Sequence, residues 1–190
     1  MSTTVNASID VDVPVRVAYD QWTQFESFPE FLGGVESVTQ LNDTMTHWVV
    51  SIGGVEREFD AEIGDQVPDD HVTWRSIGEV THRGRVEFTP KGADSTRVDL
   101  EIEWKPEGFV EGAGAALQLD DMQVKSDLKR FKEFVENRGT ATGAWRGEVH
   151  GGTAGPTTGA AGMPGMTETP GTTGTAGTAG ATGTDPDLNV

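Results

Sequence analysis

Three side chains in this sequence could take part in acid–base or hydrogen-bonding chemistry inside an apolar space: Arg57, His82 and Asp120. Arg57 could donate to a carbonyl, phenolate or carboxylate, because a guanidinium among apolar side chains needs a partner. His82 or Asp120 could move protons near neutral pH. Each also has a plain structural interpretation: an arginine that reaches the rim or pairs with an acid, an exposed histidine at a strand start, and a carboxylate in water.

Large apolar side chains are expected to face the same space as Arg57. The candidate ligand-binding set combines Arg57 with Trp48, Phe59, Trp74, Phe88, Trp104, Phe109 and Leu117. Aromatic side chains are the usual filling of a protein core, so this set predicts either an ordinary core or the wall of a cavity that holds an apolar molecule. Both interpretations stay open at this point.

Neither a metal nor a cofactor is expected from the sequence. It contains no cysteine, and its four histidines have no i, i+4 spacing that would place two of them on one helix face. It also has no G-x-S-x-G elbow, no P-loop and no G-x-G-x-x-G after a strand. His47 is assigned to a polar sheet face opposite Asp60, where an exposed pair contributes little.

A Gly-Gly hairpin at residues 53–54 sets the register that positions the candidate side chains. With a two-residue turn, Trp48 lies opposite Phe59 and Val50 opposite Arg57 on one apolar face. Short helical stretches are predicted over residues 15–24 and 28–32. Alternation of apolar and polar residues predicts strands over 5–13, 35–41, 45–52, 55–67, 71–77, 82–89 and 96–105.

A long amphipathic helix is predicted over residues 109–138, and the folded domain is expected to end there. Its apolar stripe consists of Val110, Ala113, Leu117, Val124, Leu128, Phe131 and Val135. Residues 139–190 are mostly Gly, Thr, Ala and Pro, which cannot build a core, so they are predicted to form a disordered tail. Removal of residues 141–190 should then leave the melting temperature nearly unchanged.

The charge of the chain excludes two classes of partner. With 14 Lys and Arg against 31 Asp and Glu, the net charge is −17, which repels nucleic acid and anionic lipid surfaces. We interpret this charge as a source of solubility, with a cationic partner or a high-salt habitat as alternatives. No apolar run is long enough for stable membrane insertion, and the start of the chain lacks signal-peptide features, so a cytoplasmic location is expected. No protein partner is indicated.

Several segments resemble those of one superfamily: Ile9–Val15 with Ala18–Trp22, Phe25–Phe31, Val35–Val38, Val72–Ser76, Gly84–Phe88 and Leu128–Lys132. Together with the element order, they are similar to the START-like (SRPBCC) superfamily. The resemblance is to its bacterial polyketide cyclase/dehydrase and lipid-transport branch, which includes coenzyme Q-binding proteins. It covers residues 3–138 and implies an α+β helix-grip fold (β-α-α-β6-α), in which a curved antiparallel sheet wraps around a long C-terminal helix. The family has no shared catalytic motif to carry over.

The resemblance and the apolar face together favour a binding module for a small apolar or aromatic molecule, held between the sheet and the final helix for transport or sequestration. The alternative is an aromatase/cyclase or dehydratase, with Arg57 polarising a carbonyl and His82 or Asp120 transferring protons. A third hypothesis is a non-catalytic structural or chaperone-like partner with a filled core. The identity of the ligand and the oligomeric state stay open.

Overall fold

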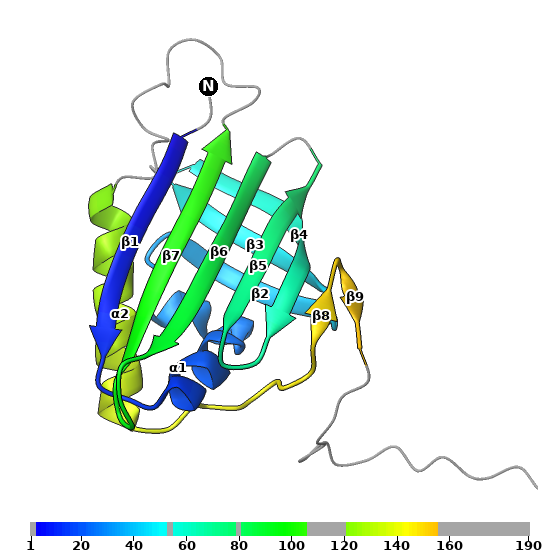
Figure 1. Cartoon of the computed structure of the whole chain (residues 1–190). Coiled ribbons are helices and arrows are strands. Elements are labelled where there is room, and N and C mark those ends of the chain that lie inside the picture. Colours follow the sequence, from blue (N-terminus) through cyan, green and yellow to red (C-terminus); the bar gives the residue numbers. More distant parts are fainter. Residues whose placement is uncertain (1–2, 53–54, 79–80, 106–120, 156–190) are drawn as a thin grey trace, which may run out of the picture. The chain divides into compact units, whose positions relative to one another are not determined.

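Seven antiparallel strands form the main path of a sheet, in the order β1-β7-β6-β5-β4-β3-β2 (Figure 1). This computed structural model describes residues 3–52, 55–78, 81–105 and 121–155. In chain order the elements are β1 (Thr3–Val11), α1 (Val15–Trp22), the 3-10 helix η1 (Phe25–Glu30), β2 (Val35–Asn42), β3 (Met45–Ile52), β4 (Val55–Val67), β5 (His71–Ile77), β6 (Thr81–Pro90), β7 (Thr96–Lys105), α2 (Asp121–Arg138), β8 (Val149–His150) and β9 (Thr153–Ala154). One strand, two short helical elements, six strands and a long helix confirm the predicted helix-grip order.

Strands β3 and β4 pair in the register that the two-residue hairpin predicts. Trp48 pairs with Phe59, and Val50 pairs with Arg57. Trp48, Val50 and Phe59 are all buried on the face that α1, η1 and α2 cover, which we call the inner face. Because side chains alternate along a strand, the intervening residues lie on the opposite, outer face.

The outer face is polar, as predicted. His47 Nδ1 lies 2.7 Å from Asp60 Oδ1, and the two side chains are 35% and 47% exposed. Arg97 Nε lies 3.1 Å from Asp99 Oδ2, in a pair that is also largely exposed. Exposed ion pairs of this kind contribute little to stability, so the inner face must supply most of the folding energy.

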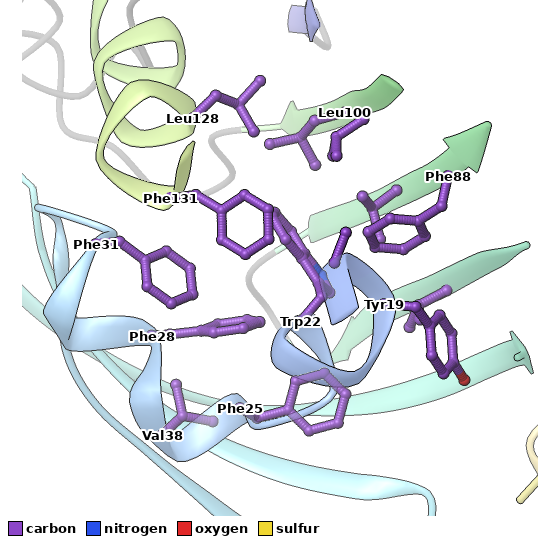
Figure 2. Packing of buried hydrophobic residues seen from close by; sticks show 14 of the residues in the cluster. Tyr19, Trp22, Phe25, Phe28, Phe31, Val38, Phe88, Leu100, Leu128 and Phe131 are labelled. Atoms are coloured by element: carbon purple, nitrogen blue, oxygen red, sulfur yellow. The ribbon is translucent and has the colours of Figure 1, made fainter. Parts of the chain in front are cut away.

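Aromatic side chains from α1, η1 and α2 fill one end of the inner face (Figure 2). The ring centroid of Trp22 lies 5.5 Å from that of Phe28, 6.3 Å from that of Phe31 and 5.1 Å from that of Phe131. In and just after η1, Phe25, Phe28 and Phe31 recur every three residues, which places them on one side of a 3-10 helix. All five side chains are buried, and we call them, with the residues that pack on them, the packed core.

Helix α2 confirms the C-terminal half of the predicted long helix. The stripe residues Val124, Leu128, Phe131 and Val135 are each at most 2% exposed. Near the start of α2, Asp127 Oδ1 accepts hydrogen bonds from the backbone N–H of residue 33 and from the Arg130 guanidinium, which joins the helix to the end of η1. The predicted residues Phe109, Leu117 and Asp120 lie outside the described residues. Among the described residues, no helix is long and apolar enough to cross a membrane.

The folded chain continues past Arg138, so the predicted domain boundary lies too early. Strand β8 pairs with β4 through Val149 and Gln66, and Val149 is fully buried. The backbone N–H of Thr142 donates to Gln21 Oε1 at 2.9 Å, and Gln21 Nε2 donates back to Thr142 Oγ1 at 3.2 Å. Residues 141–155, which we call the C-terminal strap, are therefore packed on α1 and β4, and their removal cannot be neutral.

An arginine fastens this strap to the rest of the domain. Arg146 Nη1 donates to Asp20 Oδ1 at 2.7 Å, and Arg146 Nη2 donates to Asp69 Oδ2 at 2.6 Å. The guanidinium also lies over the Tyr19 ring, 5.6 Å from its centroid. The two carboxylates raise the pKa of Arg146 above its ordinary value. Asp69 holds a left-handed backbone conformation (φ 63°), which aspartate tolerates in turns.

Candidate functional site

The inner face carries a continuous row of rings that extends from the packed core across four strands, β3 to β6. The row consists of Phe28, Trp48, Phe59, His82 and Trp74, and successive ring centroids are 5.5, 6.1, 5.7 and 6.4 Å apart. Trp48 and Phe59 stack with their planes only 6° apart. We call this set the aromatic row. It joins three of the predicted candidate residues, Trp48, Phe59 and Trp74, to His82.

The two ends of the aromatic row differ in burial. Phe28 is 3% exposed and belongs to the packed core, and Trp48 and Phe59 are nearly as buried. Trp74 and His82 are half-buried, as is Ile102 beside them on β7. The packed core therefore does not extend over the far end of the row, and apolar surface there stays accessible.

The predicted ligand-binding residue Phe88 belongs to the packed core. Its ring lies edge-on to Tyr19, 5.7 Å between centroids, and to Trp22 at 6.2 Å. It is 3% exposed. The alternation of β6 correctly predicts that Phe88 points inward, but the residues of α1 cover that part of the sheet.

A glycine opposite Trp74 determines how the indole lies. Trp74 on β5 pairs with Gly84 on β6. A Cβ atom at Gly84 would lie 2.6 Å from Cε2 of Trp74, far inside van der Waals contact. The indole can therefore lie against the β6 backbone because residue 84 has no side chain. The sequence indicates an inward position for Trp74, but it does not show that Gly84 is its neighbour across the strands.

His82 lies between two aromatic rings and does not suit proton transfer near neutral pH. Its ring lies between those of Phe59 and Trp74, and its backbone N–H donates to Ser76 Oγ at 2.8 Å. Burial lowers the pKa of His82 to about 4. The imidazole is thus neutral at about pH 7, which weakens its predicted role as an acid or base and leaves a neutral hydrogen-bonding group.

Arg57 is the remaining polar candidate within the described residues. It lies on β4 opposite Val50, as predicted, and its side chain is half-buried. Asp120, which could have paired with it, lies outside the described residues. Trp104 pairs with His82 through the backbone of β7. Among the described residues, no group of three or more His, Cys, Asp or Glu side chains could hold a metal ion.

A separate, open depression of about 710 Å³ lies along β1, β6, β7 and α2. Its lining includes charges of both signs, among them Arg85, Glu87, Asp99, Lys125 and Lys129. It contains none of the rings of the aromatic row. A wall of this composition does not match the predicted apolar site, whereas the row does.

Comparison with known proteins identifies the family of this chain. The family model described as polyketide cyclase / dehydrase and lipid transport matches residues 11–136. An uncharacterized 17.2 kDa protein from the melC2-rnhH intergenic region of Streptomyces lincolnensis is 49% identical over 146 residues, which cover 76% of this chain and 97% of that protein.

Solved structures share the fold at low sequence identity. A Deinococcus radiodurans protein is 24% identical with a TM-score of 0.60, and the match covers 72% of this chain and 98% of that one. The Zhui aromatase/cyclase from Streptomyces sp. R1128 is 13% identical with a TM-score of 0.60, over 76% of this chain and all of the other. The family match spans most of the domain, and the fold agrees with that of START superfamily structures. The chain therefore belongs to the polyketide cyclase/dehydrase and lipid transport family.

Proposed function

We propose that this protein binds a small hydrophobic or aromatic molecule on the inner face of its sheet and does not transform it. The aromatic row carries this proposal. Its rings run from η1 across strands β3 to β6, and the end formed by Trp74 and His82 is half-buried and leaves flat surface accessible to a ligand. A planar ligand laid on that end would stack on the rings of Trp74 and His82, and the Trp74 indole is already held against the β6 backbone at Gly84.

Burial of accessible apolar surface supplies the binding energy. Ile102 and Trp74 are half-buried although both side chains are apolar over most of their area. Removal of such surface from water contributes about 25 cal/mol per Å². The ion pairs His47–Asp60 and Arg97–Asp99 lie on the outer face, so apart from Arg57 the inner face of these strands offers a ligand mainly apolar contacts.

The protonation state of His82 supports binding rather than acid–base catalysis. A general acid or base works best when its pKa lies near the working pH, and burial lowers the pKa of His82 to about 4. A cyclase or dehydratase is the second candidate, and the half-buried Arg57 on the inner face favours it because a guanidinium can polarise a carbonyl. The Zhui aromatase/cyclase resembles this chain in fold alone.

Native mass spectrometry of the full-length protein purified from its own host tests the proposal. We expect a retained apolar molecule of constant mass. A retained molecule that loses one water over time, with the loss abolished by Arg57→Met, would support the cyclase or dehydratase instead. A ligand-free protein that also fails to bind an apolar dye such as N-phenyl-1-naphthylamine would contradict both.

Two phenylalanines provide a matched pair of variants for the same dye. Phe59 belongs to the aromatic row and Phe88 to the packed core, and both are buried strand residues. Phe59→Leu should weaken dye binding about fivefold, because an aromatic contact is lost. Phe88→Leu should lower the free energy of unfolding by about 1–3 kcal/mol and leave the dye affinity of the folded protein unchanged. Equal effects of both variants on dye affinity would contradict a site at the row.

A further inference from the structure

Two indole N–H groups on the inner face differ in whether they have a hydrogen-bond acceptor. Trp48 Nε1 donates to Thr46 Oγ1 at 2.8 Å. Trp74 Nε1 is shielded from solvent and has no acceptor within the part of the chain that the structure describes. Both side chains belong to the aromatic row, so the contrast arises within one surface.

A buried donor without an acceptor needs an explanation. Such a group loses its hydrogen bond to water and gains nothing in return, at a cost of about 1–3 kcal/mol. Native proteins rarely retain one unless an unseen group supplies the acceptor. A ligand on the aromatic row is a natural source of that acceptor, because the Trp74 ring lies at the half-buried end of the row.

The position of the indole is fixed by its neighbours. Trp74 pairs with Ile63 on one side and with Gly84 on the other. The indole occupies space in which a Cβ at residue 84 would be placed, and its ring centroid lies 6.4 Å from that of His82. A donor held in this way selects for an acceptor at one place, which is how polar groups in apolar sites provide specificity.

We propose that Trp74 donates its indole N–H to an oxygen of the bound ligand, and that the preferred ligands are planar aromatic molecules with an uncharged carbonyl oxygen. This inference rests on the proposed binding function and adds a specificity-determining residue to it. An uncharged acceptor is favoured because the neighbouring rings give a charged oxygen little compensation for lost water. Gly84 is a positioning residue, since it acts through the Trp74 ring.

Fluorene and 9-fluorenone provide the test, because these tricyclic molecules have nearly the same shape and only fluorenone has a carbonyl. Each competes with N-phenyl-1-naphthylamine for the full-length protein. We expect fluorenone to bind about tenfold more tightly than fluorene, the gain that one hydrogen bond to an otherwise unpaired donor allows. Trp74→Phe should remove this preference, because fluorenone loses the hydrogen bond in addition to the stacking area that both compounds lose. Trp48→Phe should change both affinities together and keep their ratio.

Two further measurements show whether Trp74 or Arg57 is the donor, and whether the loss of preference in Trp74→Phe comes from a folding defect. In wild-type protein labelled with nitrogen-15, one indole N–H resonance should move downfield with fluorenone and not with fluorene, and that resonance should be missing in Trp74→Phe. Arg57→Met should keep the fluorenone preference. If Arg57→Met removes the preference and Trp74→Phe does not, Arg57 is the donor and the inference is wrong. Equal binding of fluorene and fluorenone to the wild type would also overturn the inference about Trp74, but it would leave the proposed binding function intact. If neither compound displaces the dye, the inference and the proposed binding function are both contradicted.

Discussion

At the scale of single residues, two histidines show how local packing determines chemistry. His47 lies on the outer face, where its Nδ1 is 2.7 Å from Asp60 Oδ1 and its side chain is 35% exposed. His82 lies between two aromatic rings on the inner face, and burial lowers its pKa to about 4. The alternation of each strand predicts these faces. It cannot predict the pKa, because that depends on rings from β4 and β5.

The lowered pKa of His82 predicts a pH-dependent stability. Between about pH 6.5 and pH 4, the unfolded chain binds a proton at His82 that the folded chain does not. The free energy of unfolding should therefore fall as the pH falls through this window and be independent of His82 above it. Urea unfolding at a series of pH values measures the slope. His82→Gln should make it shallower, whereas Phe88→Leu, in the packed core and away from His82, should lower stability at every pH and keep the slope. An unchanged slope in His82→Gln would contradict the assignment.

At the scale of elements, the buried stripe of α2 makes the helix a structural requirement for the inner face. Phe131 contacts Trp22 and Phe31 at ring-centroid distances of 5.1 and 5.2 Å and is fully buried. Phe131→Ala should lower the free energy of unfolding by about 3–5 kcal/mol, through lost burial and the cavity left behind. Lys129→Ala, at an exposed position of the same helix, should change it by less than about 0.5 kcal/mol. Denaturant unfolding measures both, and similar losses would contradict the assigned helix face.

The C-terminal strap predicts a contrast between two shortened chains. A chain that ends at Gly139 lacks Arg146 and the buried Val149, so its melting temperature should fall clearly. A chain that ends at Gly155 keeps every described contact of the strap and should melt like the full-length protein. Calorimetry of the three chains measures the difference. Identical melting of all three would show that the strap contributes no stability.

Arg146 is the residue of the strap whose removal should cost most. Its side chain is 22% exposed, and its partners Asp20 and Asp69 are 9% and 34% exposed. Arg146→Met should destabilise the fold by about 1.5–3 kcal/mol, because it leaves two partly buried carboxylates without their charged donor. Arg138→Met provides the control: Arg138 lies 3.8 Å from Glu30 in an exposed pair and should cost little. Equal losses in urea unfolding would contradict the role of Arg146.

The fold could be predicted because its signals are local, and the strap was missed because its contacts are not. The hairpin at residues 53–54 determines the β3–β4 register through turn geometry alone. By contrast, Thr142 binds Gln21 across more than a hundred residues, in a segment whose composition suggests disorder. A signal was present: Trp145, Arg146 and Val149 interrupt the small residues, and a second Gly-Gly pair at 151–152 has the positive φ angles of a tight hairpin turn.

The sequence predicts which residues of the candidate site point inward, but it does not predict which of them contact one another. Alternation correctly turned Trp48, Phe59 and Trp74 inward. It could not separate Phe88, which α1 covers, from the aromatic row, because coverage depends on how the helices pack on the sheet. The contact of Trp74 with Gly84 likewise depends on the pairing of β5 with β6.

For the domain as a whole, the described part of the inner face has one end that is tightly packed and another, half-buried end at which we propose that the ligand binds. The packed core, the stripe of α2 and the strap meet around α1. The aromatic row leads away from them to the half-buried Trp74 and His82. This separation would let the binding end change its side chains without loss of the fold, which agrees with a family that combines polyketide cyclases, dehydrases and lipid transport proteins.

The same separation predicts a pattern of hydrogen exchange in the whole protein. Amides of α1 and α2 should be well protected in the free protein, because the inward side chains of both helices belong to the most buried part of the domain. Addition of 9-fluorenone should slow exchange in β5 and β6 around Trp74 and His82 and leave α1 and β8 unchanged, since ligand contacts stabilise the open end against local unfolding. The chain that ends at Gly155 should give the same pattern. Protection that appears in α1 and β8 instead would place the ligand beside Arg146, away from the aromatic row.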